Sequence, residues 1–359
     1  MTSSATVSPG VPEAVPVVSV KPVVLDAPER GADLRVRVSA PVTGSGLPVV
    51  LLAHGFGSSL DGYGPLADHW AAHGFVVVQP THRDSRTTGT AAGGPHGPRL
   101  WRSRVDDMRL VLDRLDELTA AVPGLAGRTD HGRIAAAGHS FGGQTAGVLL
   151  GLRVRDPETG AVEDLSDPRV GAGVLLATAG RGGDSLTPFA DEHLPWLRDP
   201  DFTHMTGPTL VVMGDRDELP LTVRGAEWTA DPYVLSPGGK SLLTLFGAQH
   251  FLGGISGYEV AETTDENPAH VALVQRVTLA YLRHALGVDG DGWRAVRREF
   301  ADGAHPLGRL ESKQDTGTPG GGARGADGSD GSDGQEPAVA SAGSGASTGP
   351  EWRGPRART

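Results

Sequence analysis

Residues 132–143 read Gly-Arg-Ile-Ala-Ala-Ala-Gly-His-Ser-Phe-Gly-Gly, and they decide the fold that we expect for the chain. The apolar run at 133–137 predicts a strand buried on both faces, because such a strand needs no alternation with polar residues. The pattern Gly-x-Ser-x-Gly follows, in which glycines allow a sharp turn from strand to helix. Ser140 is the predicted nucleophile, and a helix over 144–152 would direct unpaired N–H groups at a developing oxyanion. Such a short pattern also arises by chance, so the predicted strand and helix around it are what favour a catalytic serine.

Two further predicted strands, 208–213 and 241–246, end in Gly-Asp-Arg-Asp and Gly-Ala-Gln-His. His250 is the expected base, since a serine hydroxyl is a weak nucleophile until its proton is removed. A carboxylate must then hold the imidazole in the correct tautomer. Asp217 and Asp215 compete for this role. Asp217 is favoured because it lies just past the strand, whereas Asp215 suits a turn or the surface.

A second glycine turn, His-Gly-Phe-Gly at 54–57, follows an apolar strand predicted over 48–53. Acyl transfer requires two N–H donors aimed at the oxyanion. The backbone amides of Phe56 and Phe141 are the candidates, because Phe141 directly follows the nucleophile and the turn brings Phe56 to a strand end. The alternative is an ordinary strand-to-helix loop in which Phe56 only packs.

The segment 180–206 breaks the rhythm of strands and helices. Its apolar residues, which include Phe189 and Trp196, indicate either an insertion able to cover an apolar substrate as a lid or an irregular crossover that packs on the sheet. We predict substrate contacts from Phe189, Trp196, Phe56 and His139, although His139 also suits a packing role beside the nucleophile.

Two polar pairs favour structural roles. His82 and Asp84 follow a buried strand and resemble half a metal site, but no further ligand lies at a suitable spacing, so we expect loop contacts and no metal. Arg104 and Asp107 occupy positions i and i+3 of a helix predicted over 101–118, where their side chains can pair.

Taken together, the Gly-x-Ser-x-Gly turn, the 54–57 turn and the two strand ends with Asp217 and His250 resemble the α/β-hydrolase superfamily over roughly residues 17–286, with the order Ser, Asp, His. Through the Trp-x-x-Arg-x-x-Asp pattern at 101–107, the chain resembles one branch of that superfamily, which contains chlorophyllase-like, platelet-activating-factor-acetylhydrolase-like and dienelactone-hydrolase-like enzymes. The resemblance implies an α/β-hydrolase fold, with a mostly parallel central sheet, helices on both faces and a small insertion over the active site. It also implies a serine esterase with an oxyanion hole from the Phe56 and Phe141 amides.

Composition limits the domain organisation and the partners. The 359 residues carry a net charge of −11 and include no cysteine. An acidic chain disfavours nucleic acid and anionic membranes as partners, and the missing cysteine excludes a disulfide framework and a cysteine nucleophile. We expect no membrane span, no export signal and a cytoplasmic location. We predict a disordered segment over 1–16, a hydrolase domain over 17–310 and a disordered Gly/Ser/Asp-rich tail over 311–359.

The expected function is hydrolysis of a small, apolar carboxylic ester through an acyl-enzyme, in the manner of a carboxylesterase or lipase and without a cofactor. The same triad would also serve a thioester or amide hydrolase or an acyltransferase. A non-catalytic binding protein on the same fold is the rival from another class, although it predicts a damaged triad.

Overall fold

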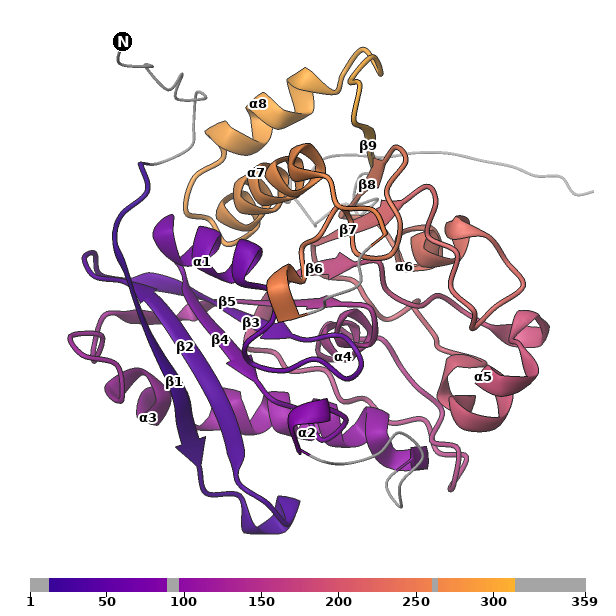
Figure 1. Cartoon of the computed structure of the whole chain (residues 1–359), viewed down its shortest axis with the longest axis horizontal. Coiled ribbons are helices and arrows are strands. Elements are labelled where there is room, and N and C mark those ends of the chain that lie inside the picture. The colour runs from indigo at the N-terminus through magenta and orange to yellow at the C-terminus, as the bar shows by residue number, and fades with distance from the viewer. Residues whose placement is uncertain (1–12, 89–96, 260–263, 314–359) are drawn as a thin grey trace, which may run out of the picture. The chain divides into compact units, whose positions relative to one another are not determined.

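Strands β3 to β8 run parallel at the centre of a sheet whose order is β1-β2-β4-β3-β5-β6-β7-β8-β9 (Figure 1). This is a computed structural model, and it describes residues 13–88, 97–259 and 264–313. Antiparallel strands flank the parallel ones at both edges, β1 and β2 on one side and β9 on the other. The strands are β1 (Val17–Leu25), β2 (Leu34–Pro41), β3 (Leu47–Ala53), β4 (Val76–Pro80), β5 (Thr129–His139), β6 (Val170–Leu176), β7 (Thr209–Gly214), β8 (Lys240–Leu245) and β9 (Gly308–Lys313).

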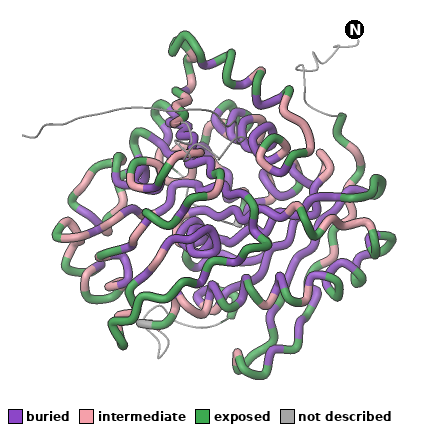
Figure 2. The backbone as a smooth tube through the Cα atoms, turned by 180° about the vertical axis from the view of Figure 1, so that it is seen from behind, coloured by how far each residue is buried: buried purple, intermediate pink, exposed green. Residues whose placement is uncertain are grey.

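Helices cover both faces of the sheet and form two apolar cores with it. In β3, Val49 and Leu51 belong to one core and Val50 and Leu52 to the other, which explains why this strand is apolar throughout. The first core includes α2 (Leu100–Asp113), α3 (Leu115–Ala120) and α4 (Phe141–Leu149); the second includes α1 (Gly64–Ala72), α7 (Pro268–Ala285) and α8 (Asp291–Glu299). Figure 2 shows the buried strands between partly exposed helices.

Shorter helices occupy the connections. Helix α5 (Pro188–His193) lies in the insertion, and α6 (Asp231–Val234) contacts β7 and β8. The 3₁₀ turns are η1 (Pro28–Arg30), η2 (Arg86–Thr88), η3 (Gly97–Arg99), η4 (Gly183–Ser185), η5 (Pro195–Leu197), η6 (Ala226–Ala230) and η7 (Gly257–Glu259).

The mostly parallel α/β architecture agrees with the prediction, while several element boundaries differ. The helix expected over 101–118 is two helices, because the backbone leaves the helical region at Arg114 with φ −111° and ψ 21°. The helix after Ser140 begins at Phe141, earlier than expected, because the strand turns into the helix within one residue. Helix α1, which starts at Gly64, follows Tyr63, whose backbone is left-handed with φ 61°.

The domain limits also need adjustment. Strand β9 pairs with β8 and extends to Lys313, past the predicted boundary at residue 310. At the other end, Val15 N–H donates to the carbonyl of Ala72 at 2.9 Å, so ordered structure begins before residue 17. The rest of the predicted terminal segments, 1–12 and 314–359, lies outside the described residues. Among the described helices, none combines the length and the apolar character that crossing a bilayer demands.

Candidate active site

Ser140 occupies a one-residue elbow between β5 and α4. Its backbone angles, φ 55° and ψ −122°, lie outside the regions that residues other than glycine favour. The neighbouring glycines make the turn possible, because a Cβ at Gly138 would overlap the carbonyl of Gly142, and one at Gly142 would overlap the carbonyl of Ala53. Thr178 then fixes the elbow by donating its hydroxyl to the Ser140 carbonyl at 3.0 Å.

His250 and Asp217 meet beside this elbow. The His250 Nδ1 lies 3.0 Å from Oδ1 and 3.1 Å from Oδ2 of Asp217, whose side chain is fully buried. A carboxylate only accepts hydrogen bonds, so Nδ1 carries the proton and Nε2 remains free to act as a base. The His250 ring lies 4.7 Å from the ring of His139, the residue before Ser140. Within the described part of the chain the Ser140 hydroxyl forms no hydrogen bond, a common finding in unliganded enzymes.

Asp215 is occupied elsewhere. Its carboxylate accepts a hydrogen bond from Gly247 N–H at 2.6 Å and is exposed, so it ties the ends of β7 and β8 together. Of the two carboxylates that the sequence left in competition, Asp217 is the one in contact with His250.

The two predicted oxyanion donors are unoccupied backbone amides. In the 54–57 turn, Gly55 N–H donates to the Tyr63 hydroxyl at 3.0 Å and Gly57 N–H to Asp84 at 3.2 Å, whereas Phe56 N–H has no acceptor among the described residues. Phe141 N–H is the first amide of α4 and likewise has no acceptor in the described segments. Free amides at these two positions suit an anionic oxygen.

An apolar cavity of about 520 Å³ opens beside Ser140. Phe56, Phe141, Phe189, Trp196 and Ser140 are among its lining residues. Trp196 stacks on Phe141 at 5.7 Å between ring centroids, so the insertion packs directly against the elbow helix. Three of the predicted substrate-contacting residues therefore lie in one cavity with the predicted nucleophile. Residues 189 and 192–197 of the 180–206 segment form part of the lining of that cavity.

His139 departs from its predicted role as a substrate contact. It is buried behind His250 and does not line the cavity. Its Nε2 donates to the His250 carbonyl at 2.8 Å, and its Nδ1 accepts from the Tyr63 hydroxyl at 2.8 Å. Burial, together with the nearby His250, lowers the pKa of His139 to about 3, so the ring stays neutral and can accept at one nitrogen while donating at the other. It is a structural link between Gly55 and His250.

Several site residues escaped the sequence reasoning. Gln144 lines the cavity one helical turn after Ser140, and Leu219 and Leu221 line it from the loop after β7. Tyr63 connects the 54–57 turn to His139. The spacing from Ser140 was a usable signal for Gln144, because residues four apart share a helix face. The others depend on contacts distant in sequence.

The polar residues near the 54–57 turn also pair differently from the prediction. Arg104 does not pair with Asp107; its Nη1 lies 2.7 Å from the Asp84 carboxylate, and both side chains are fully buried. Asp107 instead binds Arg30 at 2.6 Å and His82 at 3.0 Å. An i, i+3 spacing permits a pair, but here the partners come from η1 and from the loop after β4.

Burial sets the protonation states in this polar region. It would raise the pKa of the Asp84 carboxyl, but Arg104, together with His54, His82 and the Gly57 N–H, holds that pKa below its ordinary value. Burial raises the pKa of Asp107 in spite of the neighbouring Arg30. It also lowers the pKa values of His54 and His82 well below the usual range, so both rings are neutral at ordinary pH.

The mostly parallel sheet, the helices on both of its faces and the sharp elbow at Ser140 on its carboxyl edge give the chain the α/β-hydrolase fold. Residues 17–159 match the model of the chlorophyllase family, in agreement with the resemblance seen in the sequence. The matched region begins with β1 and includes the 54–57 turn and Ser140, while Asp217 and His250 lie beyond it.

Proposed function

We propose that this protein hydrolyses carboxylic esters, with Ser140 as nucleophile, His250 as base and Asp217 as the orienting acid. The observation that carries the proposal is the contact of His250 Nδ1 with buried Asp217, at 3.0 Å, beside a serine held in an elbow. This arrangement leaves Nε2 as the nitrogen that can take the serine proton. A strained backbone such as that of Ser140 persists only where the surrounding structure enforces it. We therefore infer that the strain at Ser140 serves the reaction.

The reaction would proceed in two steps. His250 Nε2 removes the Ser140 proton as Oγ attacks the ester carbonyl, and the resulting oxyanion accepts from the amides of Phe56 and Phe141. The C–O bond to the alcohol breaks, and the alcohol leaves with the proton from His250. Water then attacks the acyl-Ser140 ester as His250 Nε2 takes its proton; the bond between the acyl carbon and Ser140 Oγ breaks, His250 returns the proton to Oγ, and the acid is released. Asp217 stabilises the imidazolium in both steps without taking its proton.

The cavity favours an ester with a large apolar part. Phe56, Phe189 and Trp196 contribute aromatic surface to its lining. The cavity volume of about 520 Å³ is enough for a medium-sized acyl or alcohol group. Among the described lining residues, the ionisable side chains are Glu192 and His193, both contributed by α5. An apolar group gains free energy when such surfaces leave water.

Turnover of p-nitrophenyl esters from acetate to palmitate, with Ser140→Ala alongside, tests the proposal. We expect activity on esters of intermediate length and a loss of at least about 10³-fold in kcat for Ser140→Ala. Ser166→Ala, an exposed serine outside the cavity, is the matched control and should keep full activity. A fluorophosphonate probe should label Ser140 and no other serine. Wild-type hydrolysis by Ser140→Ala, or no hydrolysis of any ester, would contradict the proposal, and the second result would favour a binding protein.

A further inference from the structure

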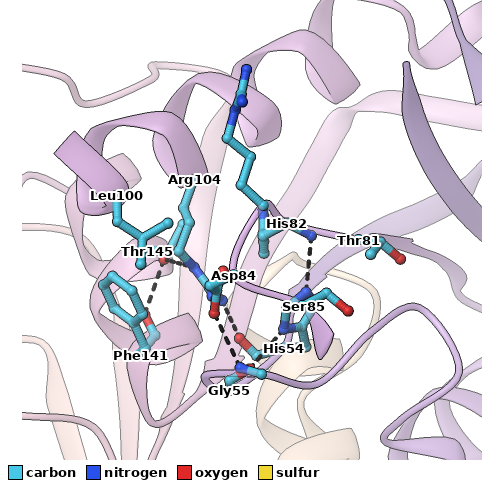
Figure 3. A network of polar contacts seen from close by, with 12 residues as sticks. His54, Gly55, Thr81, His82, Asp84, Ser85, Leu100, Arg104, Phe141 and Thr145 are labelled. Atoms are coloured by element: carbon cyan, nitrogen blue, oxygen red, sulfur yellow. Dashed lines mark hydrogen bonds and ion pairs between the residues drawn. The ribbon is translucent and has the colours of Figure 1, made fainter. Parts of the chain in front are cut away.

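Arg104 and Asp84 form a buried ion pair that the reaction does not use directly. Arg104 comes from the middle of α2 and Asp84 from the loop after β4, and neither side chain is exposed to solvent. The guanidinium Nη1 lies 2.7 Å from both carboxylate oxygens. Figure 3 shows the pair between His54 on one side and Phe141 and Thr145 on the other.

The remaining hydrogen bonds of the pair reach the two segments that carry the proposed oxyanion donors. On the first segment, Arg104 Nη2 donates to the His54 carbonyl, and Gly57 N–H donates to Asp84 at 3.2 Å. These two bonds hold the turn on either side of the free Phe56 N–H. The turn is therefore anchored at both ends by one ion pair.

On the second segment, Arg104 Nε donates to the Thr145 hydroxyl at 3.1 Å, and that hydroxyl donates to the Phe141 carbonyl at 3.0 Å. The guanidinium also lies over the Phe141 ring, 4.5 Å from its centroid. One planar group thus contacts the residue whose free N–H is the other proposed donor.

We propose that Arg104 and Asp84 are positioning residues that set the relative placement of the Phe56 and Phe141 amides, and so tune the oxyanion hole. The inference rests on the proposed function. Oxyanion stabilisation depends on donors that are already aligned when charge develops, and small displacements weaken it. Stability alone does not explain the pair, because removing two charges from water offsets much of their attraction and well-packed apolar residues often serve as well.

An arginine suits this role and a lysine does not. The guanidinium presents donors in a fixed plane and here contacts three segments at once, the loop after β3, the loop after β4 and the start of α4. A lysine ammonium keeps the charge but cannot span all three partners in that geometry.

The test compares Arg104→Lys, Asp84→Asn and Thr145→Val by kcat and KM on a p-nitrophenyl ester, with active sites counted by fluorophosphonate titration. We expect kcat per active site to fall about 10- to 100-fold for Arg104→Lys and Asp84→Asn, and to fall less for Thr145→Val. The KM should change less than about threefold in all three variants. The inhibition constant of a trifluoromethyl ketone, whose adduct carries the oxyanion, should rise by the factor by which kcat/KM falls. A product acid, which lacks the tetrahedral oxyanion, should bind as before.

Arg30→Met is the matched control. This substitution breaks the ion pair between Arg30 and Asp107, which is a second, largely buried ion pair made by a residue of α2. Neither Arg30 nor Asp107 contacts Gly57, Phe141 or Thr145. A merely structural role of buried pairs predicts that Arg30→Met and Arg104→Lys lose stability together and that both keep the wild-type kcat per active site. The positioning role predicts that only the Arg104 variant loses kcat.

The outcomes separate this inference from the proposed function. If Ser140→Ala abolishes turnover while Asp84→Asn, Arg104→Lys and Thr145→Val keep wild-type kcat per active site, the positioning role is overturned and the esterase proposal stands. If Ser140→Ala keeps its turnover, the esterase proposal itself fails. Should the charge variants not fold, Thr145→Val decides, since it is close in shape to threonine and leaves the ion pair intact: unchanged kcat and ketone affinity overturn the inference.

Discussion

Asp217 and Asp215 stand two residues apart after β7 and make different contacts. Asp217 is buried against His250 Nδ1, whereas Asp215 binds Gly247 N–H at the surface. Asp217→Asn should lower kcat by about 10³- to 10⁴-fold, because an amide can donate to Nδ1 and so favour the tautomer with Nε2 protonated. Asp215→Asn keeps an acceptor for Gly247 and should lose little activity.

Both variants would be measured by kcat on the best p-nitrophenyl ester, with unfolding in urea to show that each is folded. Equal losses from the two substitutions would contradict the assignment of Asp217. A larger loss from Asp215→Asn would move the acid role to that residue.

At the residue scale, the sequence indicated which residues lie at the ends of strands, but not which residues distant in the chain they contact. The positions of Ser140, His250 and Asp217 at strand ends were predictable because each follows a buried strand with a glycine turn, a local pattern. The link from Gly55 through Tyr63 to His139 was not, since it joins residues far apart in sequence that come together only when α1 and the sheet pack. His139 was assigned to the cavity for that reason, although it is buried and is not among the residues that line it.

The insertion that carries α5 brings an exposed aromatic side chain to the cavity. Phe189 is 59% exposed, lines the cavity and stacks edge-on against His193. Phe189→Ala should raise KM for an octanoate ester about 3- to 10-fold, because part of the ring surface would otherwise be buried against the acyl chain. The KM for an acetate ester, which has a much smaller apolar acyl group to bury, and kcat for both esters should stay close to wild type.

Val223→Ala is the control for Phe189→Ala. Val223 is 80% exposed and follows Leu221 in the same surface region, but it does not line the cavity. If KM rises equally for acetate and octanoate, or if Val223→Ala has the same effect, the insertion does not bind the acyl chain.

Elements were predictable where they were apolar and periodic. The consecutive apolar residues of β3 and β5 identified parallel strands, because both faces of these strands are covered. The break between α2 and α3 was not visible, since Arg114 carries no signal such as proline or glycine and the apolar stripe continues through it. Strand β9 was missed because Gly308–Lys313 is mostly polar and owes its structure to pairing with β8.

At the scale of the whole molecule, the sheet gathers residues from the length of the chain at one edge. Strands β3, β5, β7 and β8 are parallel, so the turns after them all lie at their carboxyl ends, and these turns carry Phe56, Ser140, Asp217 and His250. The same packing that buries these strand ends also buries several histidines. The packing that assembles the site therefore also makes the stability of the fold depend on pH.

The burial of histidines predicts that the fold weakens in acid. The pKa of His139 is lowered to about 3 by burial and by His250, while an unfolded histidine titrates near 6.5. Between these values the unfolded chain binds a proton that the folded chain does not, so the free energy of unfolding falls as the pH falls, by about 1.4 kcal/mol per pH unit for this one group. Buried His54 and His82, whose pKa values are also lowered, act in the same direction.

Urea unfolding of the wild type and His139→Gln between pH 7.5 and pH 4.5 measures this contribution. A glutamine side chain can donate to the His250 carbonyl and accept from Tyr63, as His139 does, but it takes up no proton in the unfolded chain. The variant should therefore lose stability less steeply below pH 6.5, by about 1.4 kcal/mol per pH unit. His131→Gln, a substitution at an exposed histidine, controls for the loss of an imidazole as such. The buried-histidine explanation fails if His139→Gln has the wild-type slope or if His131→Gln flattens the slope to the same extent.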